Sequence, residues 1–199
     1  MKCKKKNLAW YLLKYHIEFT DYPQNIQTIK IKTEPRGYNK IFALRDFEIF
    51  NGEKSIAKAI SRWALVNKTT KAMTIIADEI PFVGKFEKRD DDLTYTKIPT
   101  LSRIDSEKHF EIRFDDIDIN KHANNTNYIV WALETLDFDF RSKHTIKTID
   151  INYKKETSLG SKIVSKVFID NNKTYHLIKD YNTNTNKSKK QNYIKYGQL

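Results

Sequence analysis

Apolar and polar residues alternate along most of this chain, and this two-residue period constrains its fold more than any other feature. A period of two places alternate side chains on opposite faces of a β-strand, so it is typical of half-buried strands. Eight segments carry the pattern: 8–19, 27–35, 41–50, 54–66, 144–156, 161–170, 174–184 and 189–197. The chain is therefore predicted to consist mainly of antiparallel β-sheet.

The first half reads as four strands without a helix. Gly37 with Asn39 predicts one turn, and the Asn51-Gly52 pair predicts a tight hairpin turn. We expect the four segments to form a continuous antiparallel meander. Such a sheet buries one face against a helix or another element. The first half has no predicted helix, so another segment or another chain would have to cover that face.

The second half adds a strand and a helix ahead of its four strands. Phe110, Ile112 and Phe114 alternate with charged residues and predict the strand. Asn124 or Asn125 is suited to cap the helix, which we expect to run to about residue 137. The apolar residues at helical spacing are Tyr128, Trp131, Ala132 and Leu136.

These patterns predict an α+β fold with two related domains. We place the first domain at 1–76, a connecting segment at 77–107 and the second domain at 108–199. The connecting segment holds Pro81, Pro99 and a charged run, and its alternation is broken.

The net charge of +11 first suggests a nucleic-acid partner, but its distribution argues against one. Residues 1–6 carry four Lys, and 160–199 carry eight Lys and two Asp, so the rest is nearly neutral. Arg, the side chain that reads bases by paired contacts, is scarce. We therefore expect no nucleic-acid partner. We expect no membrane partner either, because no run of 18 apolar residues occurs.

The basic N-terminus lacks the apolar core of a signal peptide, so we expect a cytoplasmic protein. Cys3 alone excludes an internal disulfide framework. His16 is expected at the surface, and the isolated histidines His109, His144 and His176 predict no metal site. No cofactor is expected.

The densest polar cluster lies at 115–125, between a strand and the helix start. In an extended stretch Asp118, Asn120 and His122 would project from one side. A carboxylate, an amide and an imidazole beside the free N–H groups of a helix start suit carbonyl chemistry. The alternative is an Asx-rich turn with a capped helix, and spacing does not separate the two.

The segment RFDDIDINKHANNTNYIVWALE resembles the acyl-acyl carrier protein thioesterase family of plants and bacteria. That family carries the stretch D-L-D-x-N-x-H-V-N-N-x-x-Y-x-x-W, from which Ile117 and Ala123 are mild departures. Tyr153-Lys154-Lys155-Glu156 is similar to its Y-[RK]-[RK]-E. In the first half, LAWYLLKYHIEF, FALRDFEIFN and IAKAISRWALVN also resemble the family.

The resemblance implies tandem hotdog domains, each a curled antiparallel sheet around a central helix. Family members begin with a strand and a helix ahead of the LAW-like strand, so we expect the first domain here to lack both. A misassigned start codon, a truncated gene or a shortened chain would each explain why the strand and the helix are missing. A partner chain that covers the sheet is a further alternative.

By resemblance, the catalytic residues are Asp118, Asn120, His122 and Glu156. Glu156 would be the base that activates water, and Asn120 and His122 would position water and thioester. Asp118 would orient one of them, with direct carboxylate attack by Asp118 as the alternative. Thr157 stands where plant enzymes often carry Cys, which argues against a thiol nucleophile.

The implied function is hydrolysis of fatty acyl-acyl carrier protein, which releases free fatty acid. The acidic carrier protein would be the partner, and the basic tail with Lys187, Lys189 and Lys190 could steer it. The alternatives are an impaired relative that only binds acyl chains or carrier protein, and an acyl-CoA thioesterase. A homodimer is left open, and the sequence does not define acyl-chain length.

Overall fold

The structure, a computed structural model, describes residues 7–24, 28–80, 84–181 and 192–197. Cys3 and the tail lysines 187, 189 and 190 lie outside the described residues. The chain divides into two compact units, Met1–Tyr95 and Thr96–Leu199, which are treated separately below. The division falls inside the 77–107 segment, parts of which pack on each unit.

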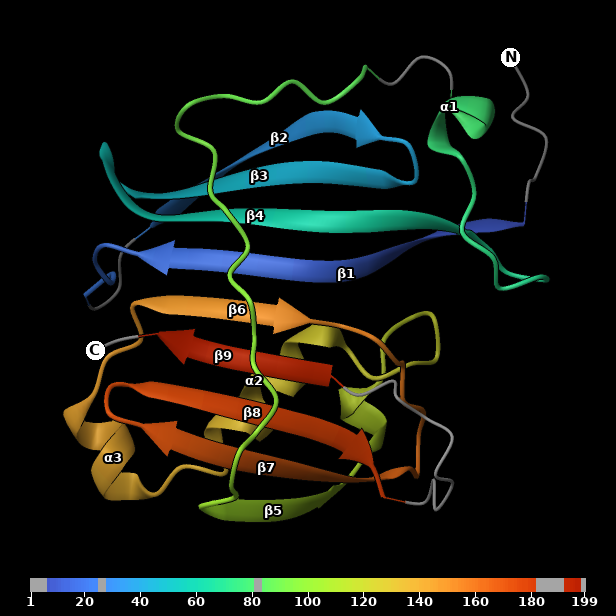
Figure 1. The fold of residues 1–199 in the computed structure, drawn as a ribbon. Helices are drawn as coiled ribbons and strands as arrows, with labels where there is room; N and C mark the ends of the chain where they lie inside the picture. Colours follow the sequence, from blue (N-terminus) through green and yellow to red (C-terminus); the bar gives the residue numbers. More distant parts are fainter. Residues whose placement is uncertain (1–6, 25–27, 81–83, 182–191, 198–199) are drawn as a thin grey trace. The chain divides into compact units, whose positions relative to one another are not determined.

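The first unit is an antiparallel sheet of four strands (Figure 1). Its elements are β1 (Leu8–Phe19), β2 (Ile29–Asn39), β3 (Phe42–Asn51), β4 (Lys54–Asn67) and the short helix α1 (Ile76–Glu79). The strand positions are confirmed, and the hairpin turn after β3 lies at Gly52 and Glu53, where Gly52 has a φ of 61°.

The predicted continuous meander is wrong for β1, because the strand order is β2-β3-β4-β1. Short turns make β2, β3 and β4 sequential neighbours, whereas the longer connection after β1 lets that strand pair with β4. In this register Ile17 and Phe19 lie opposite the small residues Ala59 and Ala57. The cross-strand fit of large against small side chains favours this pairing.

Gly37 does not form the predicted turn but lies within β2, at a bulge where the register shifts after Pro35. Its φ is +90°, and an added Cβ would stand 2.5 Å from the carbonyl oxygen of Gly84. This close approach lets Tyr38 exchange backbone hydrogen bonds with Gly84 and Phe86, at 3.1 and 2.8 Å. The segment at 84–86 thereby covers the edge strand of the sheet.

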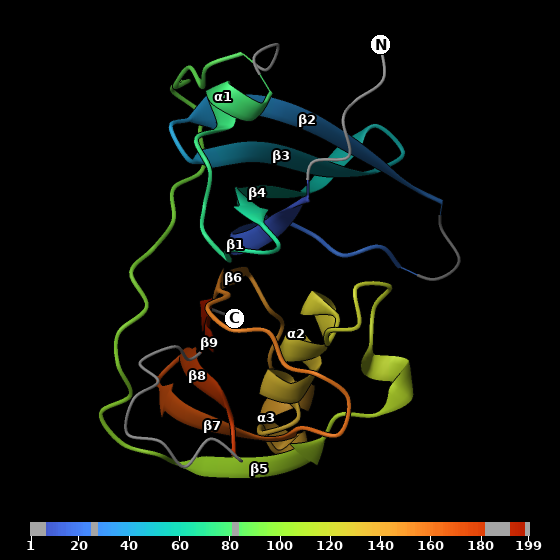
Figure 2. The same ribbon diagram turned by 90° about the vertical axis from the view of Figure 1, so that its right-hand side faces the viewer.

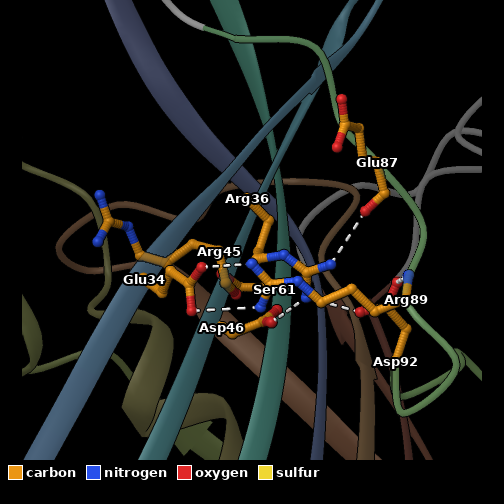
Figure 3. Close-up of polar contacts among 8 residues, drawn as sticks. All are labelled: Glu34, Arg36, Arg45, Asp46, Ser61, Glu87, Arg89 and Asp92. Atoms are coloured by element: carbon orange, nitrogen blue, oxygen red, sulfur yellow. Dashed lines mark hydrogen bonds and ion pairs between the residues drawn. The ribbon is translucent and has the colours of Figure 1, made fainter.

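Arg36 in β2 binds residues of the segment that follows 84–86, through hydrogen bonds and ion pairs (Figure 3). Its guanidinium is 3% exposed and donates to the carboxylates of Asp46 and Asp92, the second at 2.6 Å. It also donates to the carbonyl of Glu87 at 3.0 Å. A buried cation needs such a set of acceptors, so the ion pairs hold the 84–95 segment against one face of the first sheet.

His16 is 3% exposed, so the prediction of a surface position is wrong. His16 shares with Lys14 the sheet face that the connecting segment crosses. On that face the ring of Tyr95 packs under the guanidinium of Arg62 (4.7 Å) and the ammonium of Lys14 (5.6 Å). The imidazole is paired with Glu18 at 3.0 Å.

The second unit is a curved five-stranded antiparallel sheet in the order β6-β9-β8-β7-β5. Its strands are β5 (Ser106–Glu111), β6 (Thr148–Asn152), β7 (Lys162–Asp170), β8 (Lys173–Asp180) and β9 (Asn192–Gly197). Its helical elements are the single 3-10 turn η1 (Phe114–Asp116), α2 (Asn125–Leu133) and α3 (Phe138–Lys143). Figure 2 shows the sheet curling around α2.

Two boundaries in this unit differ from the predictions. Phe114 is not in a strand but begins η1, where it is 80% exposed. The central helix starts as predicted, with Asn124 as its cap, but ends at Leu133 rather than near residue 137. The Thr135 hydroxyl donates to the carbonyl of Ala132, which satisfies a terminal acceptor and lets the chain turn toward α3.

The buried face of α2 joins the sheet through aromatic and polar contacts. Trp131 lies 5.1 Å from the ring of Tyr128 and 6.4 Å from that of Phe110. Near the end of the helix, Thr135 Oγ1 lies 3.2 Å from Nδ1 of His176 in β8. No helix in the described part of the chain is long and apolar enough to span a membrane.

His176 is wholly buried and should make stability depend on pH. Its Nε2 contacts the hydroxyl of Thr174 at 2.9 Å and its ring packs edge-on against Tyr196. Burial lowers the pKa of His176 from 6.5 to about 3. Between these values the unfolded chain binds a proton that the folded chain does not, so the free energy of unfolding falls as pH decreases.

Between pH 7 and pH 5, the free energy of unfolding of the wild type should fall by about 2 kcal/mol because of His176. We expect His176→Gln to lack this part of the decrease. Urea denaturation at both pH values measures the difference. His109→Gln, at an exposed position on β5, is the matched control and should keep the wild-type pH dependence. Parallel pH dependences for wild type and His176→Gln would contradict the prediction.

Candidate active site

The residues 117–123 form a tight loop between η1 and α2, rather than the extended stretch considered above. Asp118 makes the loop, because its Oδ1 accepts the backbone N–H groups of Asn120 (2.8 Å) and His122 (3.3 Å). Lys121 adopts a φ of 66°, and the N–H of Asp118 donates to the carbonyl of His122. The loop closes with a bridge between Ile117 and Ala123.

The predicted site residues form two contacting side-chain pairs in the second unit, Asp118 with Asn120 and His122 with Glu156. Oδ2 of Asp118 accepts from the side-chain amide of Asn120 at 3.3 Å. Nδ1 of His122 lies 3.4 Å from Oε2 of Glu156, which follows β6 and is distant in sequence. Their side chains are 33% and 43% exposed, so water reaches the imidazole–carboxylate pair.

Asp116 lies just before the 117–123 loop and is buried, with 4% of it exposed. Its carboxylate accepts from the backbone N–H of Arg113 (2.9 Å) and from the Arg113 guanidinium (3.1 Å). Burial acts to raise the pKa of Asp116, but the contacts with Arg113 outweigh it and hold the pKa below its usual value. Its carbonyl accepts from Asn124 and Asn127, which ties the loop to the start of α2.

The segment that carries Glu156 is held by buried polar groups on both sides of it. Asn192 in β9 accepts the N–H groups of Lys154 (2.7 Å) and Lys155 (3.2 Å) and donates to the carbonyl of Lys155 (2.9 Å). The Thr157 hydroxyl meets that of Tyr128 at 2.9 Å.

The same segment is tied to the 117–123 loop, since the carbonyl of Thr157 accepts the N–H of Ala123 at 2.8 Å. Burial raises the pKa of Tyr128, and the nearby charge of Glu156 adds to this, against opposing hydrogen bonds from Thr157 and Asn192.

The sequence predicted Asp118, Asn120, His122 and Glu156 as site residues but not Asn192. Asn192 stands in a strand segment with no motif, and its neighbours in sequence carry no signal of its contacts. No group of three or more His, Cys, Asp or Glu within the described ranges could hold a metal ion. The arrangement offers one carboxylate and one imidazole to water, and the Asn120 amide lies on the same loop as the imidazole.

Comparison with known proteins places both halves of the chain in one family. The profile of the acyl-ACP thioesterase N-terminal domain matches residues 1–82, and that of the C-terminal domain matches residues 101–196. The chloroplastic oleoyl-acyl carrier protein thioesterase of Coriandrum sativum is 27% identical over 168 residues. This match covers 77% of the chain but only 45% of the relative, so the chain spans about half of that protein's length.

Solved structures share the fold. The 12:0-ACP thioesterase from Umbellularia californica aligns with a TM-score of 0.82 over 98% of this chain and 76% of that one, at 20% identity. An acyl-ACP thioesterase from Bacteroides thetaiotaomicron gives 0.79 over 97% and 77%, at 21% identity. The α+β hotdog class predicted above is confirmed. With both domain profiles matched in order along the sequence, the chain belongs to the acyl-ACP thioesterase family.

Proposed function

We propose that this chain hydrolyses the thioester of fatty acyl-acyl carrier protein and releases free fatty acid. The observation that carries the proposal is the approach of His122 Nδ1 to Glu156 Oε2 at 3.4 Å, with the Asn120 amide on the same loop as His122. Thioester hydrolysis needs an activated water and a polarised carbonyl, and these three side chains are suited to supply both.

In the proposed reaction, Glu156 takes a proton from a water molecule as the water oxygen attacks the thioester carbon. The negative charge that develops on the carbonyl oxygen is stabilised by hydrogen bonds from the Asn120 amide or from backbone N–H groups. The intermediate then collapses with cleavage of the C–S bond. The proton held by Glu156 passes to the departing thiolate, and the fatty acid releases its remaining proton to solvent and leaves as a carboxylate.

Asp118 has an orienting role in this proposal. Both of its carboxylate oxygens already accept hydrogen bonds, from the backbone of Asn120 and His122 and from the Asn120 amide. An oxygen held by donors is a weaker nucleophile, which favours Glu156-assisted attack by water over direct attack by Asp118. His122 would steady the Glu156 carboxylate and the water.

The acidic acyl carrier protein is the proposed partner. A cytoplasmic location stays a prediction from the sequence, and a homodimer stays open. The runner-up functions are a relative that binds acyl chains or carrier protein without turnover, and an acyl-CoA thioesterase.

Parallel assays of the 199-residue chain with acyl-acyl carrier protein and acyl-CoA test the proposal. We expect release of free fatty acid, measured by mass spectrometry, with the higher kcat/KM for the carrier-protein thioester. A higher kcat/KM for acyl-CoA would favour the acyl-CoA thioesterase. Binding of the acyl-carrier protein without turnover of either thioester would favour the non-catalytic relative.

A further inference from the structure

Glu156 lies on a short irregular segment between β6 and β7, and exposed irregular backbone does not by itself hold a carboxylate in one place. A catalytic base must stay within hydrogen-bonding reach of the proton that it removes. Some contact of this segment must therefore define where Glu156 stands.

Asn192 makes the contacts that can do so. It is 2% exposed and lies in β9, which pairs with β6 and β8 inside the sheet. Its oxygen accepts two consecutive N–H groups, and its nitrogen donates to a carbonyl of the same segment. Three hydrogen bonds from one rigid strand position fix the backbone directly ahead of Glu156.

The residue after Glu156 is held as well, so the carboxylate is bracketed. Thr157 is 5% exposed and is bonded to Tyr128 in α2 and to Ala123 in the 117–123 loop. The Tyr128 hydroxyl also lies 3.5 Å from the carbonyl oxygen of Lys155, to which Asn192 donates, and this shared carbonyl links the two anchors. Glu156 thus projects from a backbone that is fixed on both sides and faces His122.

We propose that Asn192 is a positioning residue that holds Glu156 against His122. The assignment rests on the proposed function, since it gives Asn192 its role through the catalytic base. Only a side chain with an acceptor and a donor together satisfies both the N–H groups and the carbonyl of the segment. Leu at this position would leave all three backbone groups without their partner, and Asp would keep the acceptor but lose the donor.

The kinetic test uses the full chain with acyl-acyl carrier protein. We expect Asn192→Leu to lower kcat by about 100-fold with little change in KM, because a displacement of about 1 Å suffices for such a loss. Asn192→Asp is the milder variant, in case the Leu protein does not fold, and should lower kcat by about tenfold through one lost hydrogen bond. Thr135→Val is the matched control, since it removes buried hydrogen bonds at the other end of α2. It should leave kcat unchanged.

A double-mutant cycle separates positioning from general destabilisation. If Asn192 acts through Glu156, Asn192→Asp should change the residual kcat of Glu156→Gln by less than about twofold. Equal fold-losses in the two backgrounds would overturn the assignment. So would a Thr135→Val variant that loses as much kcat as Asn192→Asp.

A second readout does not depend on activity. Crystal structures of the wild type and of Asn192→Asp should show the Glu156–His122 contact in the first and its loss in the second. A wild-type protein that hydrolyses no thioester would refute the proposed function, while these structures would still decide whether Asn192 places Glu156. An unchanged contact in Asn192→Asp would overturn the inference even if hydrolysis is confirmed.

Discussion

Glu156→Gln is expected to lower kcat for acyl-acyl carrier protein hydrolysis by about 100- to 10,000-fold, the range for loss of a general base. The amide keeps the size of the side chain and its reach to His122 but cannot accept a proton from water. KM should change little, because the substrate is not bound through this proton transfer. Steady-state release of fatty acid measures both constants.

Glu134→Gln is the matched control for this variant. Glu134 follows the last residue of α2, where it pairs with Lys108 and Arg141 away from the site, so its loss should leave kcat unchanged. Unchanged turnover in purified Glu156→Gln would refute the assignment of the base.

A single turnover in ¹⁸O-labelled water then separates the two routes of attack. Attack by water places the label in the fatty acid. Direct attack by Asp118 would form an acyl-enzyme anhydride whose hydrolysis can leave the label on Asp118. We expect no label on Asp118.

Trp131→Ala is expected to lower the free energy of unfolding of the second unit by about 3–5 kcal/mol. Trp131 is 5% exposed and its ring packs against Tyr128 and Phe110, so truncation removes a large apolar contact and leaves a cavity under α2. Urea denaturation followed by far-UV circular dichroism measures the loss.

Val130→Ala tests whether this effect comes from burial rather than from the helix itself. Val130 is the neighbouring residue of α2 and is 52% exposed. Its truncation should change the free energy of unfolding by less than about 0.5 kcal/mol. Equal losses for the two variants would contradict the packing argument.

The strands could be predicted because their signal is local. Residues 8–19 and 54–66 alternate in sequence, and they form β1 and β4. The helix start could be predicted for the same reason, since Asn124 accepts from the N–H of Thr126 two residues later. The partner of β1 could not, because pairing depends on which distant strand fits it.

The prediction of a surface position for His16 rested on polarity alone and is wrong. His16 and His176 look like isolated polar residues in strands, yet the structure buries both. Their burial depends on what covers the sheet face: the connecting segment over the first sheet, and α2 with the turn after it, which holds Thr135, over the second. A polar side chain can be buried when a distant segment supplies its hydrogen bonds.

The candidate site divides in the same way. Asp118, Asn120 and His122 stand within five residues, so sequence alone determined that they are close, along with the strand content and the family resemblance. Only the tertiary structure decided that the loop is a turn, that Glu156 reaches His122, and that Asn192 holds the backbone ahead of Glu156. These last contacts join residues 34 or more positions apart. The Asn192 contacts depend on the pairing of β6 with β9, and the Glu156–His122 contact lies beside the hydrogen bond from Ala123 to Thr157, neither of which a local pattern encodes.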